Sequence, residues 1–91
     1  MAYYCIHSKQ NYSNGYTTGE EVLTEETGDA MPKDSYHNLG NGFTNDEYFS
    51  TYEEARERFD FILQSYYKHN ITGIHINRHD KVKGERSSYD A

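Results

Sequence analysis

The chain has few of the residues that usually build a hydrophobic core. Ile, Leu and Val together account for ten of the 91 residues, tyrosine alone accounts for another ten, and tryptophan is absent. A tyrosine ring can pack in a core, but its hydroxyl needs a hydrogen-bonding partner, so tyrosines concentrate at surfaces that contact other molecules. We therefore expect one small domain with a thin stability margin, because a chain of this length buries only about two-thirds of its surface.

The clearest local pattern lies in residues 50–69. Apolar side chains recur there at alternating spacings of three and four residues, which predicts one amphipathic helix of about five turns. The apolar stripe consists of Tyr52, Ala55, Phe59, Ile62 and Tyr66. Ser50 and Glu53 form a capping box at the start of this helix. Thr51 and Glu54 offer the same motif one residue later.

The Asn14-Gly15 dipeptide predicts a β-hairpin near the N-terminus. Asn and Gly readily adopt the positive φ angles that a two-residue type I′ turn requires. Such a turn sets the cross-strand pairs Ser13–Tyr16, Lys9–Glu20 and Ile6–Leu23. This register is favourable because it matches opposite charges with each other and apolar side chains with each other.

A second strand is expected after the helix. Asn70 is a suitable left-handed helix stop, and residues 71–77 then alternate between two faces, which predicts a half-buried strand. These elements predict an α+β fold, a small two-layer sandwich in which one amphipathic helix packs on an antiparallel sheet of three or four strands. The other face of the sheet would be exposed. It would carry Tyr3, Cys5, His7, His75 and Asn77.

Two segments lack a regular pattern. Residues 28–46 contain several turn-forming residues without a sustained period, which predicts a long loop or an irregular strand. Residues 81–91 are polar, and we expect a flexible tail there, although Val82 or Tyr89 could dock on a sheet edge. The folded domain is therefore expected to span residues 1–80.

The net charge of −6 is distributed unevenly. Residues 1–60 contain twelve acidic and four basic residues, whereas residues 61–91 contain three acidic and five basic ones. An acidic body repels phosphate backbones and attracts basic protein surfaces, so we expect no direct binding of nucleic acid. The simpler alternative is that these charges only keep the protein dissolved.

The composition also favours a cytoplasmic location. Cys5 is the single cysteine, so no internal disulfide can form, which fits a reducing compartment. No apolar run approaches the ~18 residues that a membrane-spanning helix needs. The N-terminus lacks the basic start and apolar stretch of a secretory signal. We therefore expect a cytoplasmic protein with no membrane partner.

A cluster of cysteine and histidine residues is one candidate site. Cys5 and His7 share one strand face, and His75 and His79 could share another. If these strands were neighbours, one thiol and three imidazoles would be available to bind zinc tetrahedrally. Their spacing does not match a standard zinc finger, so the alternative is that they are simply exposed strand residues.

Catalytic motifs are absent from the sequence. It contains no nucleophile elbow, no P-loop, no dinucleotide-binding glycine motif and no paired-acid motif. His79 and Asp80 are neighbours, but on a strand they would point to opposite faces, which is a poor geometry for acid-base chemistry. We therefore expect a protein that is not an enzyme and needs no cofactor, unless the cysteine and histidine cluster binds zinc.

Acidic clusters interleaved with tyrosines define the predicted partner-binding surface. Such a surface could imitate the phosphates of a nucleic acid and occupy the basic groove of a nucleic-acid-binding protein. The residues expected to form it are Tyr12, Tyr16, Glu20, Glu21, Glu25, Glu26, Asp29, Tyr36, Asp46 and Glu47.

The combination of small size, acidity and many tyrosines is similar to that of the antagonists that phages and mobile elements encode against host nucleases. This resemblance implies a non-catalytic inhibitor of a host defence protein such as a CRISPR effector or a restriction enzyme. The alternatives are a small metal- or ligand-binding domain and a structural subunit. The latter would self-associate through an exposed sheet edge, so a monomer and a homodimer both stay open.

Overall fold

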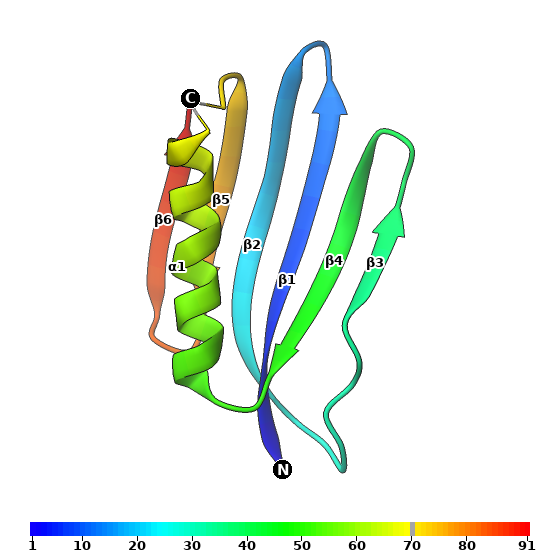
Figure 1. Ribbon diagram of the computed structural model, residues 1–91, viewed down its shortest axis with the longest axis vertical. Helices are drawn as coiled ribbons and strands as arrows, with labels where there is room; N and C mark the ends of the chain where they lie inside the picture. The colour runs from blue at the N-terminus through cyan, green and yellow to red at the C-terminus, as the bar shows by residue number, and fades with distance from the viewer. Residues whose placement is uncertain (70) are drawn as a thin grey trace.

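A computed structural model of the protein describes residues 1–69 and 71–91 and contains a six-stranded sheet with one helix packed on it (Figure 1). The elements are β1 (Ala2–Ser13), β2 (Tyr16–Thr27), β3 (Ser35–Asn38), β4 (Gly42–Phe49), α1 (Tyr52–Lys68), β5 (Ile74–Asp80) and β6 (Glu85–Asp90). The strand order is β3-β4-β1-β2-β5-β6. The predicted sheet of three or four antiparallel strands is therefore wrong, although the α+β class is correct.

The sheet is mixed because α1 carries the chain across it. β5 pairs in parallel with β2, whereas the other four pairs of neighbouring strands are antiparallel. Parallel neighbours need a long crossover connection, and α1 supplies it between β4 and β5. The sequence alone identified the helix but not the strand beside which β5 would be placed.

The first hairpin has the predicted register. Asn14 and Gly15 adopt φ angles of 52° and 79°, as the two-residue turn requires. The pairs Ser13–Tyr16, Lys9–Glu20 and Ile6–Leu23 are all present. This hairpin is confirmed because its turn residues and its alternating side chains specify the same pairing.

The helix is also confirmed, with a small shift at its start. The side chain of Thr51 accepts a hydrogen bond from the backbone N–H of Glu54 at 3.2 Å, so the later of the two predicted caps is used. Ser50 instead donates its hydroxyl to the Glu54 carboxylate at 3.1 Å. The predicted stripe faces the sheet, with Ala55 and Phe59 buried. The predicted stop at Asn70 lies outside the described residues.

The core consists of two adjoining groups of apolar side chains between α1 and the sheet. The first group contains Ile6, Leu23, Ala55 and Phe59. The second group contains Tyr66, Ile74, Ile76 and Tyr89. The predicted strand at 71–77 forms as β5 from Ile74, and its apolar side chains point to the helix as expected. Two tyrosines therefore replace the aliphatic residues that the chain lacks.

Three strands lie in segments that were expected to be irregular or flexible. The segment 28–46, expected to be a loop or an irregular strand, contains β3 and most of β4, which pair as a second hairpin. The segment 81–91, expected to be a flexible tail, contains β6. Tyr89 anchors β6 because it is only 3% exposed and its hydroxyl donates to the carbonyl of Ile71 at 3.2 Å.

The two faces of the sheet differ. In Figure 1, α1 lies in front of β5, between β6 and β2, and β3 lies at the opposite edge of the sheet, away from the helix. Because Ile6, Leu23 and Ile76 point to the helix layer, their neighbours along each strand point to the opposite face. Within the described residues no helix covers that opposite face, which is called the open face below.

Candidate protein-binding surface

Glu21, one of the predicted surface residues, lies in the interior. Its side chain is 1% exposed, and its carboxylate accepts a hydrogen bond from Arg78 Nε at 3.1 Å. The hydroxyl of Tyr66 donates to the same carboxylate at 2.5 Å. Burial and the Glu21 charge raise the pKa of Tyr66 above its usual range, so this hydroxyl stays protonated and can donate.

Further bonds complete this interior network. Arg78 also donates to the backbone carbonyl of Phe59, and its guanidinium lies 3.9 Å from the centre of the Phe59 ring. Gln10 donates its amide to the Tyr66 hydroxyl at 3.1 Å. In the described part of the chain, no buried side-chain polar atom lacks a hydrogen-bonding partner. The predicted surface role of Glu21 is therefore corrected to a structural one.

Many of the other carboxylates also form contacts with basic side chains of the protein. Fifteen side chains are Asp or Glu. Seven of them contact an arginine or a histidine: Glu21, Asp46, Glu47, Asp60, Asp80, Glu85 and Asp90. Two of the predicted partner-binding residues belong to this group, since Asp46 contacts His7 at 2.5 Å and Glu47 contacts Arg58 at 3.0 Å. Asp46 and Glu47 also lie on opposite faces of β4.

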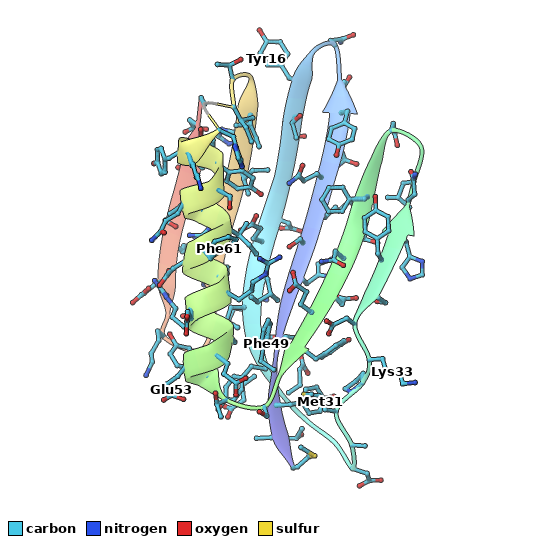
Figure 2. All side chains as sticks on the ribbon, in the orientation of Figure 1. Tyr16, Met31, Lys33, Phe49, Glu53 and Phe61 are labelled. Atoms are coloured by element: carbon cyan, nitrogen blue, oxygen red, sulfur yellow. The ribbon has the colours of Figure 1, made fainter. Side chains whose placement is uncertain are left out.

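Six carboxylates gather at one end of the molecule, and we call this set the acidic end. It consists of Glu25, Glu26, Asp29, Glu53, Glu54 and Glu57, all of which are exposed. β2 ends and α1 begins beside each other at the end that holds the N-terminus (Figure 1), and Glu53 is visible there in Figure 2. None of the ion pairs within residues 1–69 and 71–91 includes any of the six.

Tyr4 lies between the carboxylates of β2 and those of α1, and charges from both elements act on its hydroxyl. Its hydroxyl donates to Glu25 at 3.0 Å. The pKa of Tyr4 is raised by this hydrogen bond, by burial, and by the negative charges of Glu25 and Glu53. Carboxylates from β2 and from α1 therefore contribute to a common negative potential, although 28 positions separate these two residues in the sequence. Lys83 lies near this region, with its ammonium 4.9 Å from the centre of the Tyr52 ring.

The three predicted surface tyrosines are exposed but lie away from the acidic end. Tyr12, Tyr16 and Tyr36 are 48%, 67% and 61% exposed. Tyr16 lies at the tip of the first hairpin, at the opposite end of the molecule (Figure 2). Tyr36 stacks on Phe43 with 5.5 Å between ring centres. The predicted residues therefore do not form one continuous surface, because Tyr12 and Tyr16 lie towards the tip of the first hairpin and Tyr36 lies on the edge strand β3.

Glu20 is also separate from the acidic end. It is exposed on the open face and is paired in register with Lys9 of β1. Because successive strand residues point to opposite faces, Glu20 and Glu21 have different environments despite being adjacent. Glu20 therefore belongs to the open face, whereas Glu21 belongs to the core.

The four candidate metal ligands are not brought together. Cys5 and His7 lie on β1, His75 and His79 lie on β5, and β2 separates these strands. Two strand spacings place the two pairs about 10 Å apart. The expectation that neighbouring strands gather them is therefore wrong. His75 instead contacts Asp90 of β6.

Cys5 itself is a poor metal ligand in this environment. It is 7% exposed, and its thiol donates to Asp46 at 3.8 Å. Burial, followed by the Asp46 charge, raises the pKa of Cys5 to about 12. Zinc binds the thiolate, which this environment disfavours. Among the described residues, no group of three or more His, Cys, Asp or Glu side chains is arranged to hold a metal ion.

Comparison of the chain with protein-family models, with curated proteins and with solved structures found no match. No helix within the described residues is long and apolar enough to cross a membrane. The capping motifs identify Glu53 and Glu54 in the sequence, whereas Glu57 is not among the residues expected to bind a partner. Their capping position fixed them at the start of α1, but only the packing of α1 shows that β2 ends beside them.

Proposed function

We propose that the protein is a small non-catalytic binding module that docks its acidic end on the basic surface of a nucleic-acid-binding protein. The observation that supports this proposal is the contrast between two groups of carboxylates. Seven contact an arginine or a histidine, whereas the six of the acidic end are exposed and unpaired within the described residues. Unpaired charges concentrated at one end create a directional field that steers a basic partner.

The consequence for the partner would be competition with its nucleic acid. A basic groove that accepts spaced phosphates can accept spaced carboxylates, and a protein bound there blocks the groove. We therefore propose an inhibitor of a host defence protein, of the anti-CRISPR or anti-restriction type, that acts in the cytoplasm. The exposed tyrosines at the far end would contact only a partner that extends along the 42 Å length of the molecule.

The first test is an untagged pull-down from host lysate at low and at high salt. The expected result is recovery of one basic nucleic-acid-processing protein at low salt, released as salt screens the charges. Added nucleic acid must displace the module from this protein. Retention of no such protein, or retention that neither salt nor nucleic acid weakens, would overturn the proposal.

The second test uses two variants with the same change in net charge. Glu26→Gln with Glu57→Gln removes two charges from the acidic end, while Thr18→Lys with Gln64→Lys adds two positive charges elsewhere. At low salt we expect the acidic-end variant to associate with the recovered partner about tenfold more slowly, with a much smaller effect in the control. Equal effects would show that only net charge matters and would refute docking through the acidic end.

A further inference from the structure

A pocket on the open face is lined by basic side chains that form no ion pair within the described residues. It has a volume of about 720 Å³ and lies over β2, β5 and the start of β6. Its lining includes Glu20, Val22, Asn77, His79, Lys81 and Arg86. This volume falls within the range of small-molecule sites. Although the protein is acidic overall, three such basic side chains line the pocket: His79, Lys81 and Arg86.

Two arginines, Arg78 and Arg86, line this pocket, but Arg78 is buried and paired with Glu21. Arg86 differs from the other three arginines. Arg56, Arg58 and Arg78 each contact at least one carboxylate at 3.1 Å or less. No ion pair within the described residues includes Arg86, and none includes Lys81 or His79. A guanidinium presents five N–H donors in a planar fork that matches an oxyanion. Arg86 therefore has donors available for a ligand.

The strand register places positive groups opposite each other at this point. His79 pairs with Arg86 across β5 and β6. At the other end of the same strand pair, His75 lies opposite Asp90 and contacts it. The position opposite Arg86 therefore holds an imidazole rather than a carboxylate. An oxyanion bound between these two side chains would receive N–H donors from both.

Glu20 is the one acidic residue in the lining, and its position limits its effect on this site. It pairs in register with Asn77 on β5 and with Lys9 on β1, one row away from the pair formed by His79 and Arg86. The side-chain amide of Asn77, which lies in the same row as Glu20, adds neutral N–H donors. The pocket therefore has its basic side chains, Lys81, His79 and Arg86, at one end and Asn77 with Glu20 at the other.

We propose that this pocket binds a phosphate dianion, either free or as the monoester of a small molecule. Arg86 would bind two phosphate oxygens through its guanidinium, Lys81 would neutralise the second charge, and His79 would donate an N–H to a third oxygen. The excess volume beyond one phosphate would hold the remainder of an ester, and Glu20 would accept hydrogen bonds from its hydroxyl or amino groups. A small ligand is favoured over nucleic acid because the acidic body repels a polyanion. This site is separate from the acidic end and does not depend on the proposed function.

The proposal can be tested by NMR titration of the ¹⁵N-labelled protein at pH 7.5, where phosphate is mostly a dianion, and at constant ionic strength. The probes are inorganic phosphate, glycerol phosphate and acetate. We expect both phosphates to shift the resonances of Asn77, His79 and Arg86 saturably, with a dissociation constant of about 1 mM or below. Acetate should bind at least tenfold more weakly because it carries one charge. Tighter binding of inorganic phosphate would identify free phosphate as the ligand, and tighter binding of the ester would identify the monoester.

Two variants with the same charge change provide the control. Arg86→Gln should weaken phosphate binding about tenfold or more, since it removes a charge-assisted bidentate contact. Lys33→Gln, in the loop before β3, should leave binding unchanged. Both variants should retain the thermal midpoint of the parent, because both side chains are exposed. Equal binding of acetate and phosphate, equal effects of the two variants, or tighter binding of single-stranded DNA at the same residues would overturn the proposal.

Discussion

Replacement of Arg78 by methionine should remove much of the stability of this domain. Arg78 and Glu21 are 2% and 1% exposed, so neither charge can recover hydration when its partner is removed. Methionine has a similar length but no charge, and the variant therefore leaves the Glu21 carboxylate buried with only the Tyr66 hydroxyl as a donor. The contacts of Arg78 with the carbonyl and the ring of Phe59 are lost as well.

The magnitude can be estimated from these contacts. Removal of one partner from a buried ion pair costs about 3 to 5 kcal/mol, because the other charge is left uncompensated. A domain of this length has a total stability of about 5 to 14 kcal/mol. The Arg78→Met variant should therefore lose about a fifth or more of its free energy of unfolding. Adding Glu21→Leu removes the orphaned charge and should restore at least half of the loss.

Urea denaturation at pH 7, followed by circular dichroism, measures these differences. Arg58→Met is the matched control, since it breaks an ion pair with Glu47 whose members are 41% and 18% exposed, and we expect it to cost about 1 kcal/mol or less. The reasoning would be refuted if Arg78→Met cost no more than this control. It would also be refuted if the double variant with Glu21→Leu were as unstable as the sum of the two single variants.

Three further predictions concern single residues. Burial raises the pKa of Cys5 from 9.0 to about 12, so a disulfide reagent at pH 8 should modify it about 1,000-fold more slowly in the folded than in the unfolded protein; comparable rates would contradict its burial. The Tyr52 hydroxyl donates to the buried Asp80 carboxylate at 2.6 Å, so Tyr52→Phe should cost about 1.5 kcal/mol by urea denaturation. Because the pKa of Tyr52 is raised from 10.0 to about 12 in the folded protein, this contribution is complete below pH 10 and is lost as the pH rises to about 12. If the difference in free energy of unfolding between variant and parent stays constant over this pH range, the Tyr52 hydroxyl is not its source. A Cβ at Gly19 would lie 2.0 Å from the Lys9 carbonyl oxygen, so Gly19→Ala should lower stability by about 1 to 3 kcal/mol, and an unchanged thermal midpoint would disprove this close approach.

Local chemistry was sufficient to predict two elements of the fold. The Asn14-Gly15 turn fixed the register of β1 and β2, and the apolar stripe fixed the buried face of α1. β4 could not be predicted because nearly all its residues are half-buried, so apolar and polar side chains do not alternate along its sequence. β6 could not be predicted because only Tyr89 of its six residues is buried. Both strands depend on hydrogen bonds with a neighbour, and single-residue patterns do not record such bonds.

The sequence by itself determined the charge, the hairpin, the helix and the excess of tyrosine over aliphatic residues. Only the tertiary structure decided which charged groups meet. It placed Glu21 in the core and Glu20 on the open face, and the crossover through α1 brought the carboxylates after residue 52 beside the end of β2. The same pairing of strands set His79 opposite Arg86 and separated the candidate metal ligands. Each of these outcomes depends on contacts between segments distant in the chain, and the energy of such contacts comes from packing and strand pairing rather than from local preference.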